Sequence, residues 1–118
     1  MIMADASDQM MLVLDVANGS KADRDAAAFG LHGYLVDGDS AMQLVMLLDR
    51  RDPAVRDAAA YALQEGTIPD DAAAQLVLLL DKPDPAVRNA AARALQGTKI
   101  TGPFADQYRA EIQRRLEA

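Results

Sequence analysis

The residue types that carry out most enzyme chemistry are scarce in this chain. His32 is the only histidine and there is no cysteine, which excludes a cysteine nucleophile, a thiolate metal site and any site built on two histidines. A serine nucleophile activated by His32 would need a serine beside it. Ser7 lies near the terminus, and Ser20 and Ser40 stand where helix caps are expected. We therefore expect a protein that is not an enzyme.

Two acidic turns are candidates for binding a hard cation, Asp37-Gly38-Asp39 and Asp70-Asp71. Carboxylate oxygens are suitable ligands for such ions, but aspartate is also favoured in turns and at helix starts for local hydrogen-bonding reasons. Gly30, Gly33 and Gly38 lack the spacing of a phosphate-binding loop. We expect neither a metal nor a cofactor.

The elements that must position these residues repeat along the chain. Residues 52–64 read Asp-Pro-Ala-Val-Arg-Asp-Ala-Ala-Ala-Tyr-Ala-Leu-Gln, and residues 84–96 repeat this phrase with two changes, a period of 32. A fixed period in this range is typical of a solenoid, whose units are too small to bury their apolar faces alone. In both copies the Asp can cap a helix that begins at the Pro. The apolar residues that follow form one helical stripe, from Val55 to Leu63 and from Val87 to Leu95.

The period extends to both ends of the chain. Leu12-Val13-Leu14 matches Leu44-Val45-Met46 and Leu76-Val77-Leu78, so the repeats are expected at about residues 8–39, 40–71 and 72–102 of a single domain 1–118. Each consists of a first helix A and a second helix B, with Ser40 and Asp70 or Asp71 as expected caps of two A helices. A terminal helix is expected over residues 103–117. Polar residues at inner apolar positions, Asp15, Arg109 and Glu111, predict polar ends and favour a complete short solenoid.

The phrase Asp-Pro-x-Val-Arg-x-x-Ala-x-x-Ala-Leu, after an A helix ending in Leu-Leu-Asp, resembles the HEAT repeat family in its short form. This resemblance covers about residues 8–100. It implies an all-α fold, a short right-handed α-solenoid of about three helical hairpins with a C-terminal capping helix. It further implies a polar ladder between adjacent repeats, whose matching residues here are Asp52, Arg56, Asp84 and Arg88, with Arg24 in the first copy.

Positions beside the apolar stripe of the B helices form rows when the repeats are stacked. One row holds Phe29, Tyr61 and Arg93, a second holds His32, Gln64 and Gln96, and a third holds Asp25, Asp57 and Asn89, with alanines 28, 60 and 92 between. Aromatic and arginine side chains supply much of the energy of protein interfaces. The sequence therefore predicts that a protein or peptide partner binds the B-helix face, through Phe29, His32, Asp57, Tyr61, Gln64, Asn89, Arg93 and Gln96.

Charge and composition narrow the range of partners. The net charge of −6 divides into −5 for residues 1–40, −3 for residues 41–72 and +2 for residues 73–118. An acidic chain argues against nucleic acid as the partner, whereas weak head-to-tail association of copies is compatible with an acidic head and a basic tail. Residues 1–8 lack the regions of a signal peptide and the longest apolar run, Leu76–Leu80, is too short to span a bilayer. A cytoplasmic location fits best.

Two alternatives to a protein-interaction module remain open at this point. Some HEAT-like proteins handle bilin chromophores, and here Tyr34, Tyr61 and Asp57 would be the candidate residues. Others bind nucleic acid, for which the late basic residues are the candidates, namely Arg88, Arg93, Lys99, Arg109, Arg114 and Arg115.

Overall fold

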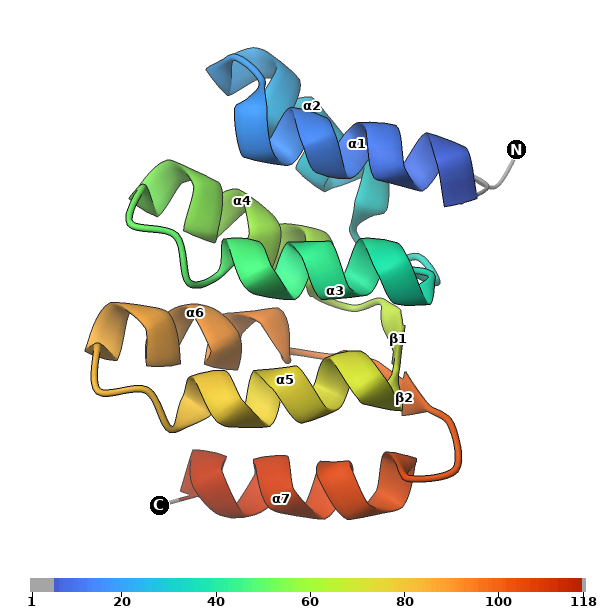
Figure 1. Ribbon diagram of the computed structural model, residues 1–118, viewed down its shortest axis with the longest axis vertical. Helices are drawn as coiled ribbons and strands as arrows, with labels where there is room; N and C mark the ends of the chain where they lie inside the picture. Colours follow the sequence, from blue (N-terminus) through green and yellow to red (C-terminus); the bar gives the residue numbers. More distant parts are fainter. Residues whose placement is uncertain (1–5, 118) are drawn as a thin grey trace.

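Two layers of helices make up the part of the chain that the computed structural model describes, residues 6–117. The A helices form one layer and contact one another in order (Figure 1), α1 (Ala6–Asn18), α3 (Gly38–Leu47), α5 (Asp70–Leu80) and α7 (Ala105–Glu117). The B helices form the other layer, α2 (Lys21–Leu31), α4 (Pro53–Leu63) and α6 (Pro85–Ala94). This is the all-α solenoid of helical hairpins that the sequence predicts. Residues 1–5 and 118 of the expected domain lie outside the described range.

The core between the layers is the stripe identified in the repeated phrase. Val55, Leu63 and Val87 are buried, and Leu95 is half-buried. Alanines on the same stripe are buried as well, and their small side chains let neighbouring B helices approach closely, which supplies dense packing in place of large aromatic residues.

Side-chain caps explain where several helices begin, although two expected caps are wrong. Asp52, Asp84 and Ser20 each accept a hydrogen bond from a backbone N–H of the following turn, as predicted. Asp37 caps α3, and Ser40 is a buried donor to it. Asp70 does not cap α5. It is buried and accepts a hydrogen bond from Phe104 N–H (2.8 Å), because the backbone before α7 lies beside it.

Each B helix returns to the next A helix through an extended segment, and these segments pair with one another. Strand β1 (Thr67–Pro69) runs parallel to β2 (Lys99–Thr101), and Leu35 bridges to Thr67 on the other side. The bonds recur with the period of the sequence: Thr67 N–H donates to Tyr34 O (3.1 Å), and Lys99 N–H donates to Gly66 O (2.8 Å). The returns therefore form a ladder between repeats, which we name the return ladder.

The same position of each return, counted by the period of 32, adopts a left-handed backbone. The φ angles are 83° at Gly33, 62° at Glu65 and 67° at Gly97. Glycine adopts this conformation without a steric penalty, whereas a residue with a Cβ atom is strained there. The middle repeat therefore keeps a strained residue at a position where both of its neighbours have glycine.

The opposite edge, where each A helix turns into its B helix, is closed by an arginine. Arg56 donates to Arg50 O (3.0 Å) and Arg51 O (3.2 Å), and Arg88 donates to Lys82 O (2.8 Å) and Pro83 O (2.7 Å). In the first repeat Arg24 donates to Gly19 O (3.2 Å), the counterpart of Arg51 O, and to Val16 O (3.0 Å). The inter-repeat ladder expected for Asp52, Arg56, Asp84 and Arg88 is corrected accordingly. The bonds described for these side chains stay within one repeat, because each aspartate caps its own helix and each arginine reaches carbonyl groups left unpaired after the A helix.

The terminal helix α7 begins two residues later than expected and packs on α5. Arg115 anchors its far end through Asp81 at the end of α5 (2.9 and 3.0 Å) and through Glu111 (2.7 Å). The hydrogen bonds with Arg115 lower the pKa of the Asp81 carboxyl and also lower the pKa of Glu111. The apolar residues at intervals of four along and just before this helix differ in burial: Ile112 is buried, Tyr108 is half-buried, and Phe104 and Leu116 are exposed.

Candidate partner-binding face

The eight residues predicted to bind a partner lie on α2, α4 and α6 or directly after these helices. Phe29 and Tyr61 occupy equivalent positions on neighbouring B helices and are 72% and 40% exposed. Asp57, Asn89 and Gln96 are also exposed, and His32, Gln64 and Arg93 are half-buried. The regular stacking of the B helices thus brings these side chains to one face of the molecule.

Tyr61 is held in place by the preceding repeat. Its ring stacks on the imidazole of His32, with ring centroids 4.2 Å apart and the planes 13° from parallel. His32 Nδ1 also lies 2.8 Å from the Tyr61 carbonyl oxygen, a hydrogen bond that requires the proton on Nδ1 because a carbonyl only accepts. The period of 32 places His32 and Tyr61 in separate rows, and their contact in the structure links the two rows diagonally.

Two further pairs join neighbouring repeats, one across the rows in the opposite direction and one along a row. Arg93 on α6 donates to the carboxylate of Asp57 on α4 (2.7 Å). Gln64 donates to the side-chain oxygen of Gln96 over a longer distance of 3.4 Å. Asn89 occupies the position of Asp57 one repeat later and lines a shallow hollow of about 540 Å³ with Ala92, Arg93 and Gln96. The predicted face is therefore largely preorganised by contacts between repeats.

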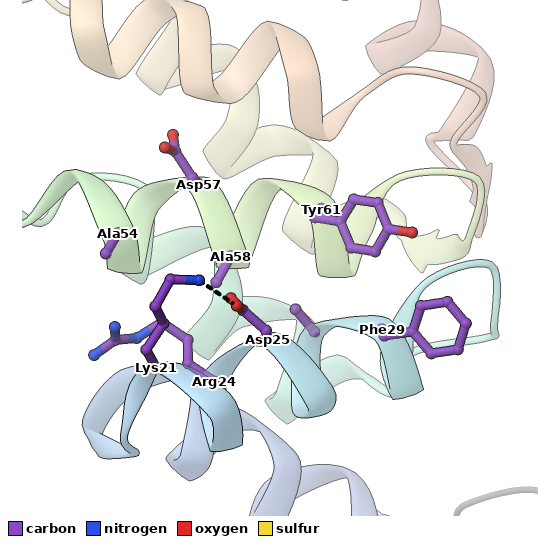
Figure 2. A pocket seen from close by; sticks show the side chains of 9 residues that line it. Lys21, Arg24, Asp25, Phe29, Ala54, Asp57, Ala58 and Tyr61 are labelled. Atoms are coloured by element: carbon purple, nitrogen blue, oxygen red, sulfur yellow. Dashed lines mark hydrogen bonds and ion pairs between the residues drawn. The ribbon is translucent and has the colours of Figure 1, made fainter.

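A groove runs between α2 and α4 and has a volume of about 560 Å³. Figure 2 shows Phe29 and Tyr61 projecting at one end of it, and Lys21, Arg24 and Asp25 gathered toward the other. Lys21 pairs with Asp25 (2.7 Å), whereas Asp57 projects from α4 away from this pair (Figure 2). The groove therefore has an aromatic end and a charged end.

The row of alanines 28, 60 and 92 lies mostly between stacked B helices. Ala28 and Ala60 are only 2% and 1% exposed, because the next B helix packs over each of them. Ala28 contributes to the base of the α2/α4 groove, but the row as a whole brings the B helices together. It does not form an open floor beneath the aromatic and arginine side chains.

The stacked hairpins agree with the comparison to known families. The family described as HEAT repeats matches this chain over residues 12–102. The chain belongs to the HEAT repeat family. No curated protein and no solved structure matches the chain by sequence.

This HEAT repeat chain also carries a second exposed row that the sequence reasoning missed. Leu14, Met46 and Leu78 lie 32 residues apart on α1, α3 and α5, and each is more than half exposed. Met46 and Leu78 border a small hollow of about 260 Å³ together with the loosely paired Asp49 and Lys82 (3.8 Å). The three residues do align with the period of 32. The apolar pattern of an A helix, however, does not indicate which of its apolar side chains the neighbouring helices leave uncovered.

Two further findings concern metal sites and membrane spans in residues 6–117. Within this range, His, Asp and Glu side chains do not gather in groups of three that could hold a metal ion. The described helices also include none that is long and apolar enough to cross a membrane.

Proposed function

We propose that this HEAT repeat chain is a non-enzymatic interaction module that binds a peptide or a protein surface along its B-helix face. Its role would be that of an adaptor, an inhibitor or a subunit of a larger complex in the cytoplasm. HEAT repeats are commonly protein-interaction modules, and the α2/α4 groove, with its exposed aromatic end, offers a surface for such a contact.

The observation that carries the proposal is the pair of exposed aromatic rings at the end of this groove. Phe29 and Tyr61 come from consecutive repeats, and the stack on His32 holds Tyr61 in one position. A preordered aromatic side chain binds at a lower entropic cost than a mobile one. The Asp57–Arg93 pair beside the rings adds charged groups for polar contacts at the rim.

The contacts of the basic residues favour a protein partner over nucleic acid. Arg93, Arg109, Arg114 and Arg115 each pair with a carboxylate, and Arg88 donates to backbone carbonyls. Phosphate binding depends on cations that are free to replace counterions. Four of the six late basic residues are therefore paired with a carboxylate.

Selection from a displayed library of random peptides tests this proposal even though the natural partner is unidentified. Peptides that bind the immobilised chain should lose at least about tenfold in affinity on the double variant Phe29→Ala/Tyr61→Ala. Tyr61→Ala/Arg93→Ala should weaken them similarly and leave helicity and melting intact. Met46→Ala/Leu78→Ala is the matched control on the A-helix face, and binding that is lost in this variant and retained in the first would contradict the proposal.

A further inference from the structure

The last B helix exposes residues that its predecessors bury. Leu95 is half-buried, whereas its counterparts 32 residues earlier, Leu63 and Leu31, are 0% and 2% exposed. Ala92 is likewise half-buried, unlike Ala60 and Ala28. The edge of α6 that points along the solenoid is therefore an uncovered copy of the edge that α2 and α4 use to receive the next B helix.

The neighbouring helix α7 also has an uncovered side, and this side has remained apolar. Phe104 is 56% exposed, although its counterparts Ser40 and Ala72 are fully buried. Tyr108 is half-buried where Leu44 and Leu76 are fully buried. Leu12, at the equivalent position of the first repeat, lies against Gly30 of its own B helix, so this side of an A helix faces its B helix.

Two other positions of α7 have become polar instead. Glu111 replaces Leu47 and Leu79, and Arg109, on the opposite side of the helix from Glu111, replaces Val45 and Val77. A solenoid end that faces water acquires polar residues in this way. The side formed by Phe104 and Tyr108 has not, and at the first of these positions a large apolar residue replaces a small one.

The inner repeats show what kind of element fits between such surfaces. Ala54 and Ala58 of α4 line the groove against α2, and with Ala62 they form a stripe of small residues at intervals of four. In α6 the corresponding stripe is Ala86, Ala90 and Ala94. The place beside α6 and α7 is thus shaped for a helix with small residues at positions i, i+4 and i+8.

Backbone hydrogen bonds and charge further define the helix that would fit the place beside α6 and α7. Gly33 N–H donates to Gln64 O and Glu65 N–H donates to Gln96 O, and the next donor in this series is Gly97. Around the place itself, Asn89 stands where earlier repeats have Asp25 and Asp57, and Lys99 replaces uncharged residues. This end of the B-helix layer has lost an acidic side chain and gained a basic one, so an acidic helix is the complementary partner.

We propose that the surface formed by Ala92, Leu95, Phe104 and Tyr108 is a second docking site, which binds one acidic amphipathic helix of a partner protein in the manner of a fourth B helix. A second copy of this chain does not fit in register. Its α2 has suitable small residues, but its α1 would then occupy the position of α7, because each A helix packs beside its own B helix. The site is separate from the α2/α4 groove, although Ala92 also lines the hollow that contains Asn89, Arg93 and Gln96.

The chain supplies its own probe for this site. A fluorescein-labelled peptide of residues 52–69 contains α4 and β1, carries three acids against one arginine, and presents the stripe Ala54, Ala58 and Ala62. Because isolated helices of this length are marginal in water, a lactam between positions 60 and 64, away from that stripe and from the charged residues, holds the helix. The control peptide has Ala58→Leu and Ala62→Leu, which preserve charge and helix propensity and prevent close approach.

Fluorescence anisotropy against the full chain measures the binding. We expect saturable 1:1 binding that Ala92→Arg or Phe104→Gln weakens at least about tenfold, with the melting temperature of each variant checked alongside. Ala26→Arg on the small-residue edge of α2 and Phe29→Ala/Tyr61→Ala in the groove should leave the affinity unchanged. The leucine peptide should bind at least about tenfold more weakly.

Three results would overturn the proposal: no saturable binding of the stapled peptide, equal binding of the leucine peptide, or binding that Ala26→Arg abolishes and Ala92→Arg does not. Sedimentation of the chain alone is measured in parallel. A concentration-dependent dimer that Ala92→Arg dissociates would assign the surface to a second copy and overturn the partner assignment.

Discussion

The two edges of this solenoid hold the chain together in different ways. At the edge where each A helix turns into its B helix, Arg24, Arg56 and Arg88 bond to carbonyls of their own repeat. At the opposite edge the return ladder joins neighbouring repeats through backbone bonds such as Lys99 N–H to Gly66 O. At the two edges, the hydrogen bonds that hold one hairpin and those that join neighbouring hairpins therefore lie in separate parts of the molecule.

The turn edge does contain a contact between repeats, but a weak one. Lys82 and Asp49 are 3.8 Å apart and both are about half exposed, and surface pairs of this kind contribute little in water. The ladder pairs uncharged backbone groups at 2.8–3.1 Å beside buried Ile68 and Ile100. Substitutions at the two edges should consequently have different effects on the cooperativity of unfolding.

The largest effect is expected for Gly66→Ala in the return ladder. A Cβ atom at this position would lie 2.6 Å from Tyr34 O, so the first and second repeats would have to move apart. Overpacking of this kind costs about 1–3 kcal/mol, and loss of coupling should also broaden the urea transition followed by circular dichroism. Gly38→Ala is the matched control, since a Cβ atom there meets nothing within 4 Å. A sharp, unshifted transition for Gly66→Ala would contradict the role given to the ladder.

A smaller effect is expected for Arg56→Ala at the turn edge. The variant leaves the carbonyls of Arg50 and Arg51 without their guanidinium donor, at a cost of about 1 kcal/mol. Because these bonds stay within one repeat, the urea midpoint should fall while the transition remains as steep as in the parent. Arg51→Ala removes an exposed arginine of the same turn and should change the midpoint little. Broadening in Arg56→Ala equal to that in Gly66→Ala would remove the distinction between the edges.

The smallest effect is expected for Glu65→Gly, and it has the opposite sign. Relief of left-handed strain outweighs the added flexibility of glycine in the unfolded chain, for a net gain of roughly 0.5–1 kcal/mol. The comparison variant Glu65→Ala removes the same carboxylate and retains the strain, so it should not be stabilised. If both variants melt at the same temperature, the strain at φ 62° is not what distinguishes this repeat.

Much of the fold could be predicted because residues 32 positions apart have the same structural role in successive repeats. The stripe from Val55 to Leu63 is buried, and Asp52, Asp84 and Ser20 cap their helices as expected. The short strands could not be predicted, because Thr67–Pro69 and Lys99–Thr101 are too brief to alternate visibly. Their pairing is a consequence of stacking, which brings equivalent segments side by side.

The sequence predicted which residues belong to the candidate site, but not which of their side chains contact one another. The sequence placed Tyr61 and Arg93 on one face, but it did not indicate that His32 would stack on Tyr61 or that Arg93 would pair with Asp57. Both contacts join positions in different rows, and the offset between stacked helices that creates them cannot be deduced from a period. The exposure of Met46 and Leu78 depends on a similar detail, the direction in which an A helix faces.

The spacing of the return ladder has a consequence for how such chains lengthen. Residues 40–71 meet the first repeat and the third through bonds displaced by one period, Gly33 N–H to Gln64 O and Glu65 N–H to Gln96 O. A tandem duplication of this segment would insert a second copy of the repeat, and the contact surfaces of this copy would already match the repeats before and after it. Gene duplication can therefore extend the array without the invention of a new junction, and with each added unit the B-helix face gains another set of side chains free to diverge.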